Sequence, residues 1–557
     1  MHLKPWILSL LLLSLLANKV SAQGQYAFRI TLTDKSGAPS VANPSVFLSQ
    51  RAIDRRSQQG IAVDSTDRPI SPVYTDSILR LTQGKFHVKS NWLNTLVILL
   101  EDSGKILQLQ GLSFIQDIKL VGFYVNGLHI VSPSGDSSAK PDDPVSETAF
   151  KTSADPAWYG STWGQTNFSG GQCLHDQGWL GQGKLIAVID DGFHGVNTAA
   201  PFDSLFSSGR IKDHYNFVKA DPDVFGFSAH GTQVLSTIAA YEPNSYVGAA
   251  PLADFALYIS EEITGEQQVE LDNLIAAFER ADSVGADIVS TSLGYNIFYG
   301  ISAYQFSNAE LNGKSTPASR AANLASQKGM LMVITMGNEG TGGLLSPGDA
   351  DSALTVGNMN ASKIPASNSG YGPNGDGVIK PEVTGLGSPA QVVSSNGNIF
   401  GVNGTSVATP QIAGYAACLW QGFPALTSWE LKRVIVAGSN LWPNAQMPQH
   451  GYGAADFCKS LTILDLEEVP SREAPELSIF PNPFERSIKL KVTAKKQGPL
   501  QLIVSDLTGT IVLQTEVFLK QGQNDIPLMI QEQLSTGVYL GCFKWDNQEK
   551  TIKLMKY

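Results

Sequence analysis

A short apolar run at residues 184–189 constrains the fold of this chain more than any other segment. The run is rich in β-branched residues and ends in the acidic pair Asp190 and Asp191, which Gly192 follows. Such a run is typical of a parallel strand buried on both faces. Sheets of parallel strands place functional side chains at their carboxyl ends. The sequence therefore predicts an α/β fold with carboxylates at the edge of the sheet where a site forms.

Two small motifs downstream add a histidine and a serine, each at the start of a helical pattern. His230 begins the first motif, and Ser406 stands in the second, with Pro410 in the first turn of the following helix. A proline is tolerated there because the N–H it lacks has no intrahelical partner. Ser406 would lie at the positive end of this helix, which favours a developing oxyanion. By itself this serine would be an ordinary helix N-cap.

An asparagine completes the set. Asn338 follows an apolar strand pattern at residues 330–335, and its side-chain amide can donate a hydrogen bond to an oxyanion. The acid, the histidine and the serine occur in the order of a subtilisin-type triad. These motifs resemble those of the subtilisin-like (S8) serine proteases, and the resemblance covers roughly residues 159–461.

The resemblance implies a role for each of these residues. Asp190 would orient the general base His230, Ser406 would be the nucleophile, and Asn338 would help to hold the oxyanion. It also implies a subtilisin-like, mostly parallel sheet with helices on both faces, in a peptidase S8 domain at residues 157–465. The implied activity is that of a secreted serine endopeptidase, which hydrolyses polypeptide substrates through an acyl-enzyme intermediate.

Asp191 departs from the family pattern, which usually has Ser or Thr at this position. Two adjacent carboxylates therefore compete for the role of the orienting acid. Consecutive strand residues point to opposite faces, so only one of them can meet His230. Alignment of the motif on Gly192 favours Asp190. Asp191 is then expected to be a solvated or hydrogen-bonded turn residue.

The substrate cleft is predicted from a second strand. Ser292, Leu293 and Gly294 follow an amphipathic helical pattern and resemble the family strand whose backbone pairs with an extended peptide. Together with Gly337 they would wall the pocket for the residue before the scissile bond. Glu339 lies near the rim of this pocket, where it would either favour basic substrate residues or remain a solvated carboxylate.

Composition limits the kinds of partner. The chain has 557 residues, of which 42% are hydrophobic and 16% charged, so it can build several cores. Its net charge of −11 argues against a nucleic-acid partner. Neither a cofactor nor a metal site is expected. A structural calcium ion cannot be assigned, because acidic loops such as residues 221–223 are too generic. We expect a monomer.

The N-terminal part of the chain predicts export and processing. Residues 1–22 combine Lys4, an apolar stretch and a small-residue cleavage site after Ala22, as an export signal does. Residues 23–131 begin with alternating apolar residues, as a strand does, and resemble an α+β prodomain of Bacteroidetes-type S8 proteases. A permanent accessory domain is the alternative. Residues 132–156 form a polar linker open to proteolysis.

Export admits disulfides, but the sequence does not choose among them. The chain has four cysteines, Cys173, Cys418, Cys458 and Cys542, which allow three pairings. A bridge between Cys418 and Cys458 belongs to one of these pairings.

The C-terminal part predicts a separate domain. After a linker at residues 466–476, residues 477–557 contain short alternating segments broken by turns, which indicate a small β-sandwich. The opening of this region, its central motif and its last strand resemble the type A sorting domain of the type IX secretion system. That machinery would be its partner, and the protein would be secreted or attached to the outer cell surface. A carbohydrate- or protein-binding sandwich is the alternative.

A different class of function also fits a protein of this organisation. It would be a catalytically inactive, surface-attached protein that binds peptides or glycans. Such a protein would need a broken triad, and none of the four motif residues is missing. The endopeptidase is therefore the favoured function.

Overall fold

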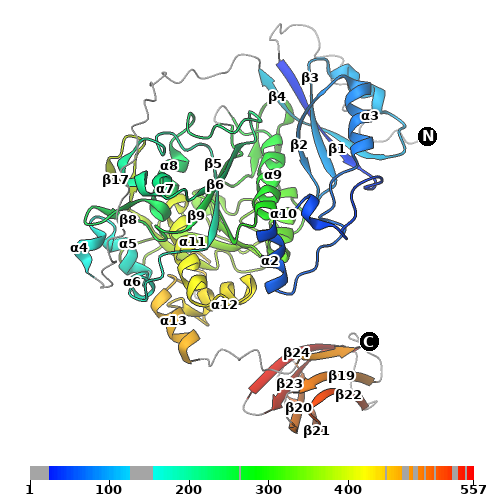
Figure 1. The fold of residues 1–557 in the computed structure, drawn as a ribbon, viewed down its shortest axis with the longest axis vertical. Coiled ribbons are helices and arrows are strands. Elements are labelled where there is room, and N and C mark those ends of the chain that lie inside the picture. The colour runs from blue at the N-terminus through cyan, green and yellow to red at the C-terminus, as the bar shows by residue number, and fades with distance from the viewer. Residues whose placement is uncertain are drawn as a thin grey trace. The chain divides into compact units, whose positions relative to one another are not determined.

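The computed structural model describes two compact units, Met1–Thr462 and Ile463–Tyr557 (Figure 1). The described residues of the first unit are 24–125, 155–262, 265–445 and 448–462. Those of the second are 463–466, 476–480, 487–494, 497–506, 510–529, 537–545 and 548–556. The expected export signal and most of both expected linkers lie outside these residues.

A seven-stranded sheet forms the centre of the peptidase region. Its order is β15-β14-β13-β10-β5-β9-β6, and every neighbouring pair is parallel. The strand predicted from the apolar run is β5, in which every residue is buried. The strands are β5 (Leu185–Asp190), β6 (Ile211–Asn216), β9 (Asp254–Ile259), β10 (Ile288–Thr291), β13 (Leu331–Thr335), β14 (Leu354–Asn360) and β15 (Val383–Ser388).

Helices cover both faces of this sheet, which is the subtilisin-like arrangement (Figure 1). Helices α8 (His230–Ala239) and α11 (Thr405–Gly422) pack together, and so do α9 (Val269–Val284) and α10 (Pro317–Gln327). Helix α11 is apolar on nearly all sides, as expected for a helix surrounded by protein. The remaining helices of this region are α4 (Pro156–Tyr159), α5 (Trp163–Phe168), α6 (Gln172–His175), α7 (Asp203–Ser207), α12 (Ser428–Gly438) and α13 (Phe457–Leu466).

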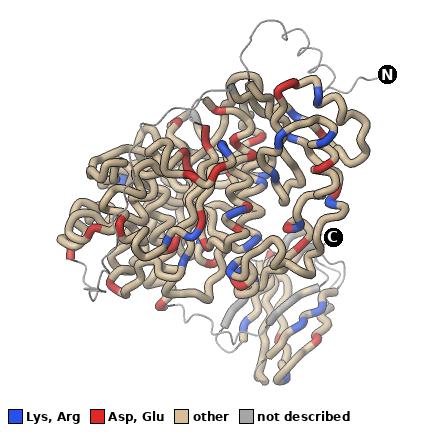
Figure 2. Tube along the Cα trace, turned by 45° about the horizontal axis from the view of Figure 1, so that its top comes forward, with Lys and Arg blue, Asp and Glu red and all other residues tan. Residues whose placement is uncertain are grey.

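Short strands and 3-10 turns complete the peptidase region. They are η3 (Ala200–Phe202), β7 (Tyr241–Glu242), β8 (Tyr246–Val247), β11 (Ile297–Phe298), η4 (Gly300–Ser302), β12 (Tyr304–Gln305), η5 (Gly340–Gly342), β16 (Ala390–Val393) and β17 (Ile399–Val402). In Figure 2, basic and acidic residues are interspersed along the trace of this region.

One disulfide closes the peptidase region, and it is not the bridge named from the sequence. Cys173 in α6 pairs with Cys458 in α13, with their Cα atoms 5.3 Å apart. The structure thus chooses a pairing that the sequence left open, and the possible bridge between Cys418 and Cys458 does not form. Cys418 lies buried inside α11, where its thiol donates to the carbonyl oxygen of Ala249 at 3.2 Å.

The N-terminal domain is an antiparallel sheet with helices. Its strand order is β2-β3-β1-β4, and alternate residues of β1 face opposite sides, as predicted. Phe28 and Ile30 face a core of this domain that includes Ile78 of α3, whereas Ala27 joins the core formed with α9. The elements are β1 (Gly24–Leu32), η1 (Pro44–Val46), α2 (Gln50–Gln58), α3 (Pro72–Thr82), β2 (Lys85–Ser90), β3 (Thr95–Leu100), η2 (Ser103–Leu109) and β4 (Ile115–Val125).

The second unit contains two antiparallel sheets around one core, a small β-sandwich. The sheets have the orders β18-β19-β22 and β21-β20-β23-β24. Leu490 of one sheet and Leu502 of the other belong to the same buried cluster. The strands are β18 (Glu476–Phe480), β19 (Ser487–Ala494), β20 (Gly498–Asp506), β21 (Ile511–Leu519), β22 (Gly522–Met529), β23 (Gly537–Trp545) and β24 (Gln548–Lys556).

A helix that crosses a bilayer must be both long and mostly apolar. Within the described ranges given above, no helix meets both requirements.

Candidate active site

An acid–base pair forms where β5 ends and α8 begins. Asp190 is the last residue of β5 and is fully buried, and His230 is the first residue of α8. The Nδ1 atom of His230 lies 2.6 Å from Oδ1 of Asp190. A carboxylate at this position makes Nδ1 the protonated nitrogen of a neutral imidazole, so Nε2 can accept a proton.

The charge of Asp190 also controls the basicity of the imidazole. It raises the pKa of His230 to about 9, against the opposing effect of burial, and the charge of Asp191 adds to the rise. An imidazole with this pKa binds a proton strongly. The arrangement therefore favours the imidazolium that a general base becomes after it takes a proton.

Asp191 makes a different hydrogen bond. Its Oδ1 accepts from the backbone N–H of Gly231 at 3.4 Å, and its carboxylate lies within 4.8 Å of ligand atoms of both Asp190 and His230. Burial and the neighbouring charge of Asp190 raise the pKa of Asp191 to about 6. Asp190 is thus the carboxylate that hydrogen-bonds to the imidazole, and Asp191 lies close by.

Ser406 lies at the amino end of α11 and is half-buried. The hydroxyl of Ser292 donates to the backbone carbonyl oxygen of Ser406 at 2.8 Å, so the strand predicted to bind substrate touches the candidate nucleophile. Helix α11 packs against α8, which carries His230. Between these two described side chains, Ser406 and His230, the structure shows no hydrogen bond. Catalytic hydrogen bonds are often long before substrate binds.

Asn338 is held beside the start of α11 by a threonine. Its Oδ1 accepts from the backbone N–H of Thr405 at 2.9 Å and from the hydroxyl of Thr405 at 3.0 Å. The Thr405 oxygen also accepts from the hydroxyl of Thr335, at 2.7 Å. Because Oδ1 is engaged in this way, the amide nitrogen of Asn338 is the end left to donate. These contacts of Thr405 were not expected from the sequence, although Thr405 is part of the Ser406 motif.

The four residues predicted to bind substrate lie on neighbouring segments. Ser292, Leu293 and Gly294 follow β10, and Gly337 follows β13, which pairs with β10 in parallel. Both segments leave the carboxyl edge of the sheet, where Asp190 also lies. An extended peptide between them would pass the start of α11.

Buried carboxylates near the triad were not foreseen from the sequence. Glu261 follows β9, and its Oε2 accepts a hydrogen bond from Tyr295 at 2.7 Å. Burial raises the pKa of Glu261 well above its usual range, and burial together with the charge of Glu339 raises the pKa of Glu266 to about 7. The charge of Glu261 is one of those that raise the pKa of His230. No motif signals them, because the sheet brings them together.

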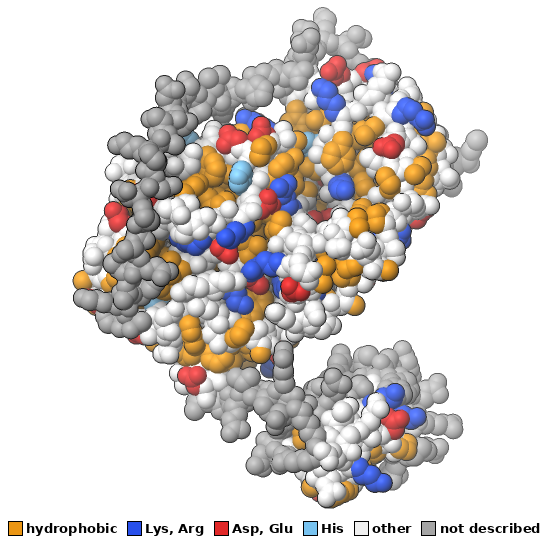
Figure 3. Space-filling view, viewed as in Figure 1, with side chains coloured by type: hydrophobic (Ala, Val, Ile, Leu, Met, Phe, Trp, Pro, Cys, Tyr) orange, Lys and Arg blue, Asp and Glu red, His pale blue; other side chains and the backbone are white. Residues whose placement is uncertain are grey.

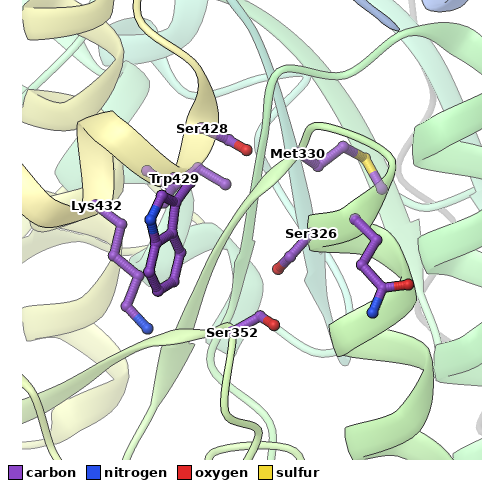
Figure 4. A pocket seen from close by; sticks show the side chains of 8 residues that line it. Ser326, Met330, Ser352, Ser428, Trp429 and Lys432 are labelled. Carbon is purple, nitrogen blue, oxygen red and sulfur yellow. The ribbon is translucent and has the colours of Figure 1, made fainter. Parts of the chain in front are cut away.

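A cavity lies at the amino end of β13, whereas the acid–base pair lies at the carboxyl edge of the sheet (Figure 4). Its volume is about 210 Å³, and Trp429 and Lys432 of α12 face Ser326 and Met330 across it (Figure 4). Met330 precedes β13, whereas Asn338 follows this strand. The cavity is therefore separate from the acid–base pair.

Metal ions in proteins are held by clusters of carboxylate, histidine or cysteine side chains. Among the residues for which the structure gives positions, the cluster with three ligand-type side chains consists of Asp190, Asp191 and His230. Two of these side chains already contact each other as an acid–base pair.

Comparison with known families assigns each part of the chain. Residues 181–455 match the subtilase family, peptidase S8. Residues 27–135 match the peptidase S8 propeptide domain of Bacteroidota, and residues 478–557 match the secretion system C-terminal sorting domain.

Several curated proteases are similar to the peptidase region. M-protease of Shouchella clausii (strain KSM-K16) is 27% identical over 259 residues, which are 46% of this chain and 59% of M-protease. Subtilisin Savinase of Lederbergia lenta is also 27% identical over 259 residues, 46% of this chain and 84% of that protein. The alignment thus spans less than two thirds of M-protease.

Solved structures to which the chain is similar include a cold adapted subtilisin-like serine proteinase. It is 24% identical, with a TM-score of 0.39, over 50% of this chain and 88% of that one. MycP1 from the ESX-1 type VII secretion system is 21% identical, with a TM-score of 0.43, over 54% and 85%. The three domain matches show a Bacteroidota propeptide domain, a peptidase domain and a secretion sorting domain in this order along the chain. The chain therefore belongs to the subtilisin-like serine peptidases of family S8.

Proposed function

We propose that this protein is a serine endopeptidase that acts outside the cell, with Asp190, His230 and Ser406 as its triad. One observation carries the proposal: the 2.6 Å contact between His230 and the buried Asp190, on a helix that packs against the helix of Ser406. A hydroxyl is a weak nucleophile at neutral pH, and an oriented imidazole is the group that activates it.

The reaction follows from the positions of these groups. Nε2 of His230 takes the proton of Ser406 as the serine oxygen attacks the scissile carbonyl, and Asp190 stabilises the imidazolium. The amide of Asn338 and the backbone N–H of Ser406 donate to the oxyanion. The imidazolium then protonates the leaving amine, and water, activated by His230, hydrolyses the acyl-enzyme.

Substrate would bind mainly through its backbone. Ser292, Leu293 and Gly294 directly follow β10, where their backbone would pair with an extended polypeptide. Gly337 would line the pocket on the other side, with Glu339 next to it. Main-chain pairing makes little demand on sequence, so this binding mode suits an endopeptidase with many substrates.

The flanking domains indicate an exported protein, either secreted or attached to the cell surface. We propose that the C-terminal sandwich is recognised by the type IX secretion machinery. The peptidase region, which matches the subtilase family, would then act after export.

Replacement of the nucleophile tests the proposal. Ser406→Ala should lower kcat by about 10⁶-fold, because no acyl-enzyme can form. A fluorophosphonate probe should label the processed parent protein and should not label the variant. Ser326→Ala, which changes a serine of the remote cavity, is the matched control and should leave labelling unchanged.

Two results would contradict this function. Labelling that survives Ser406→Ala would place the nucleophile elsewhere. A processed parent protein that binds peptides but is never labelled would instead indicate an inactive, peptide-binding protein.

A further inference from the structure

Two carboxylates beside the triad have no cationic partner among the described residues. Asp191 and Glu261 follow the neighbouring strands β5 and β9, and each is half-buried. The ion pairs of the described residues include neither of them. Lys and Arg side chains lie at several places on the visible face of the first unit (Figure 3). The lack of a cation is therefore local to this part of the cleft.

Hydrogen bonds fix the two carboxylates at the carboxyl edge of the sheet. Oδ1 of Asp191 accepts from the backbone N–H of Gly231, and Oε2 of Glu261 accepts from the hydroxyl of Tyr295 at 2.7 Å. No described residue donates to the other oxygen of Glu261. These donors carry no positive charge, so they orient the carboxylates without neutralising them.

The carboxylate of Asp190 adds to the unpaired charge. Its Oδ2 is buried and accepts no hydrogen bond from a described residue. A ligand-type atom of Asp191 lies within 4.8 Å of one in Asp190 and of one in His230. Burial raises the pKa of Glu261 to about 8, and the charges of Glu266 and of both aspartates add to the rise. Because like charges so close repel one another, this place favours a cation.

The order of the strands puts these carboxylates on one side of the cleft. Along the sheet the order is β13-β10-β5-β9. The segments after β10 and β13 would wall the pocket for the residue before the scissile bond, whereas Asp191 and Glu261 follow β5 and β9. A peptide paired with the segment after β10 therefore has that pocket on one side and the two carboxylates on the other.

The alternation of an extended peptide indicates which substrate residue meets them. Successive side chains of a strand point to opposite faces. When the side chain before the scissile bond enters the pocket, the side chain one residue earlier points toward β5 and β9. A lysine or arginine at that position would bring its charged group to Asp191 and Glu261. Charge-assisted hydrogen bonds of this kind are stronger than neutral ones.

We infer that Asp191 and Glu261 make this peptidase selective for a basic residue at the second position before the scissile bond. The inference rests on the proposed function, because it requires Ser406 as the nucleophile and a peptide along the segment after β10. The ammonium or guanidinium group of the substrate supplies the cation that the described part of the chain does not.

Two peptides that differ at one residue test this selectivity. At the second position before the bond that is cut, one has lysine and the other has methionine, which is of similar length and uncharged. Mass spectrometry of the products checks that the same bond is cut in both. The processed parent protein should have a kcat/KM about 10- to 100-fold higher for the lysine peptide.

Glu261→Gln should lower this ratio, because glutamine keeps an acceptor for the hydroxyl of Tyr295 but has no charge. Asp191→Asn should act in the same direction, and the double variant should discriminate least. A change in the base or in the nucleophile affects both peptides alike and cancels in the ratio. Glu242→Gln is the matched control, because Glu242 is exposed and follows the carboxyl end of α8, the end remote from His230.

Labelling by the fluorophosphonate probe separates failure of this inference from failure of the proposed function. A parent protein that is labelled and cuts both peptides equally well would refute the inference alone. So would a preference for lysine that neither Glu261→Gln nor Asp191→Asn reduces. A parent protein that is not labelled and cuts neither peptide would refute the proposed function, and the inference with it. If the double variant does not fold, the single variants decide.

Discussion

Asp190 and Asp191 are neighbours in the chain but have different environments. Asp190 is fully buried and contacts the imidazole, whereas Asp191 faces the start of α8 and has a pKa raised to about 6. Both negative charges favour the protonated form of His230. Asp190 therefore both contacts the base and makes the largest contribution to its raised pKa, whereas Asp191 adds only to the pKa.

The two carboxylates should respond differently to substitution. Asp190→Asn should lower kcat by roughly 10⁴-fold, because the imidazole loses its orienting partner. Asp191→Asn should lower it much less. Steady-state kinetics on a peptide substrate compares them, and the reverse ranking would show that Asp191 is the orienting acid.

The pH profile provides an independent check on the same pair. A general base must be neutral, so kcat/KM should rise with pH as His230 loses its proton, with a pKa of about 9. Asp191→Asn removes a negative charge that favours the imidazolium. The acid limb of the profile should therefore move to lower pH in this variant. An unmoved limb would mean that Asp191 does not act on His230.

At the scale of elements, the distance between α8 and α11 decides whether histidine and serine can meet. Gly414 lies in α11 where this helix approaches α8. A Cβ there would lie 2.6 Å from Cβ of Ala249 and 3.2 Å from Cγ2 of Ile238. Any larger residue must push the two helices apart or move Ala249.

Gly414→Ala should therefore lower both stability and activity. Overpacking of this kind costs about 1–3 kcal/mol, which exceeds the gain of up to about 1 kcal/mol from the helix propensity of alanine. Urea unfolding and kcat would be measured together. Gly164→Ala is the control, because a Cβ at Gly164 in α5 meets nothing within 4 Å. Equal effects of both substitutions would contradict the packing argument.

At the scale of the whole molecule, one covalent link and two domain junctions determine how the parts hold together. The Cys173–Cys458 disulfide joins residues 285 positions apart, so it ties the beginning of the peptidase region to its last helix. The sorting sandwich forms its own unit from Ile463 onward. Its core does not include residues of the peptidase region.

Loss of the disulfide should destabilise the peptidase region. Cys173→Ser should lower the free energy of unfolding by about 2–5 kcal/mol, because the cross-link no longer restricts the unfolded chain. Urea titration measures this change. A reductant should shift the midpoint of the parent protein toward that of the variant and leave the variant unchanged. A parent protein insensitive to reductant would indicate that the bridge does not form.

Deletion of residues 477–557 should separate catalysis from export. The peptidase region has its own cores, so the truncated protein should still hydrolyse peptides after refolding. It should no longer reach the medium or the cell surface, because the sorting domain is missing. Cell fractionation with an activity assay tests both parts. Unchanged secretion with lost activity would make the sandwich a working part of the enzyme.

Local sequence determined much of this protein. The structure has the strands that three local patterns predict. These patterns are the apolar run before Asp190, the alternation in β1 and the short alternating segments of the C-terminal region. Such patterns can be recognised in the sequence for a physical reason. A strand buried on one face has an apolar residue at every second position, and a strand buried on both faces has one at nearly every position.

Other features were decided only by the tertiary structure. The pairing of Cys173 with Cys458, the carboxylates near His230 and the ion pairs between α2 and α9 join residues far apart in the chain. Arg55 and Asp282, for example, are 227 positions apart and carry no local pattern that links them. Contacts of this kind depend on where the sheet and its helices place each chain segment. The number of residues between two positions does not determine their distance in the folded protein.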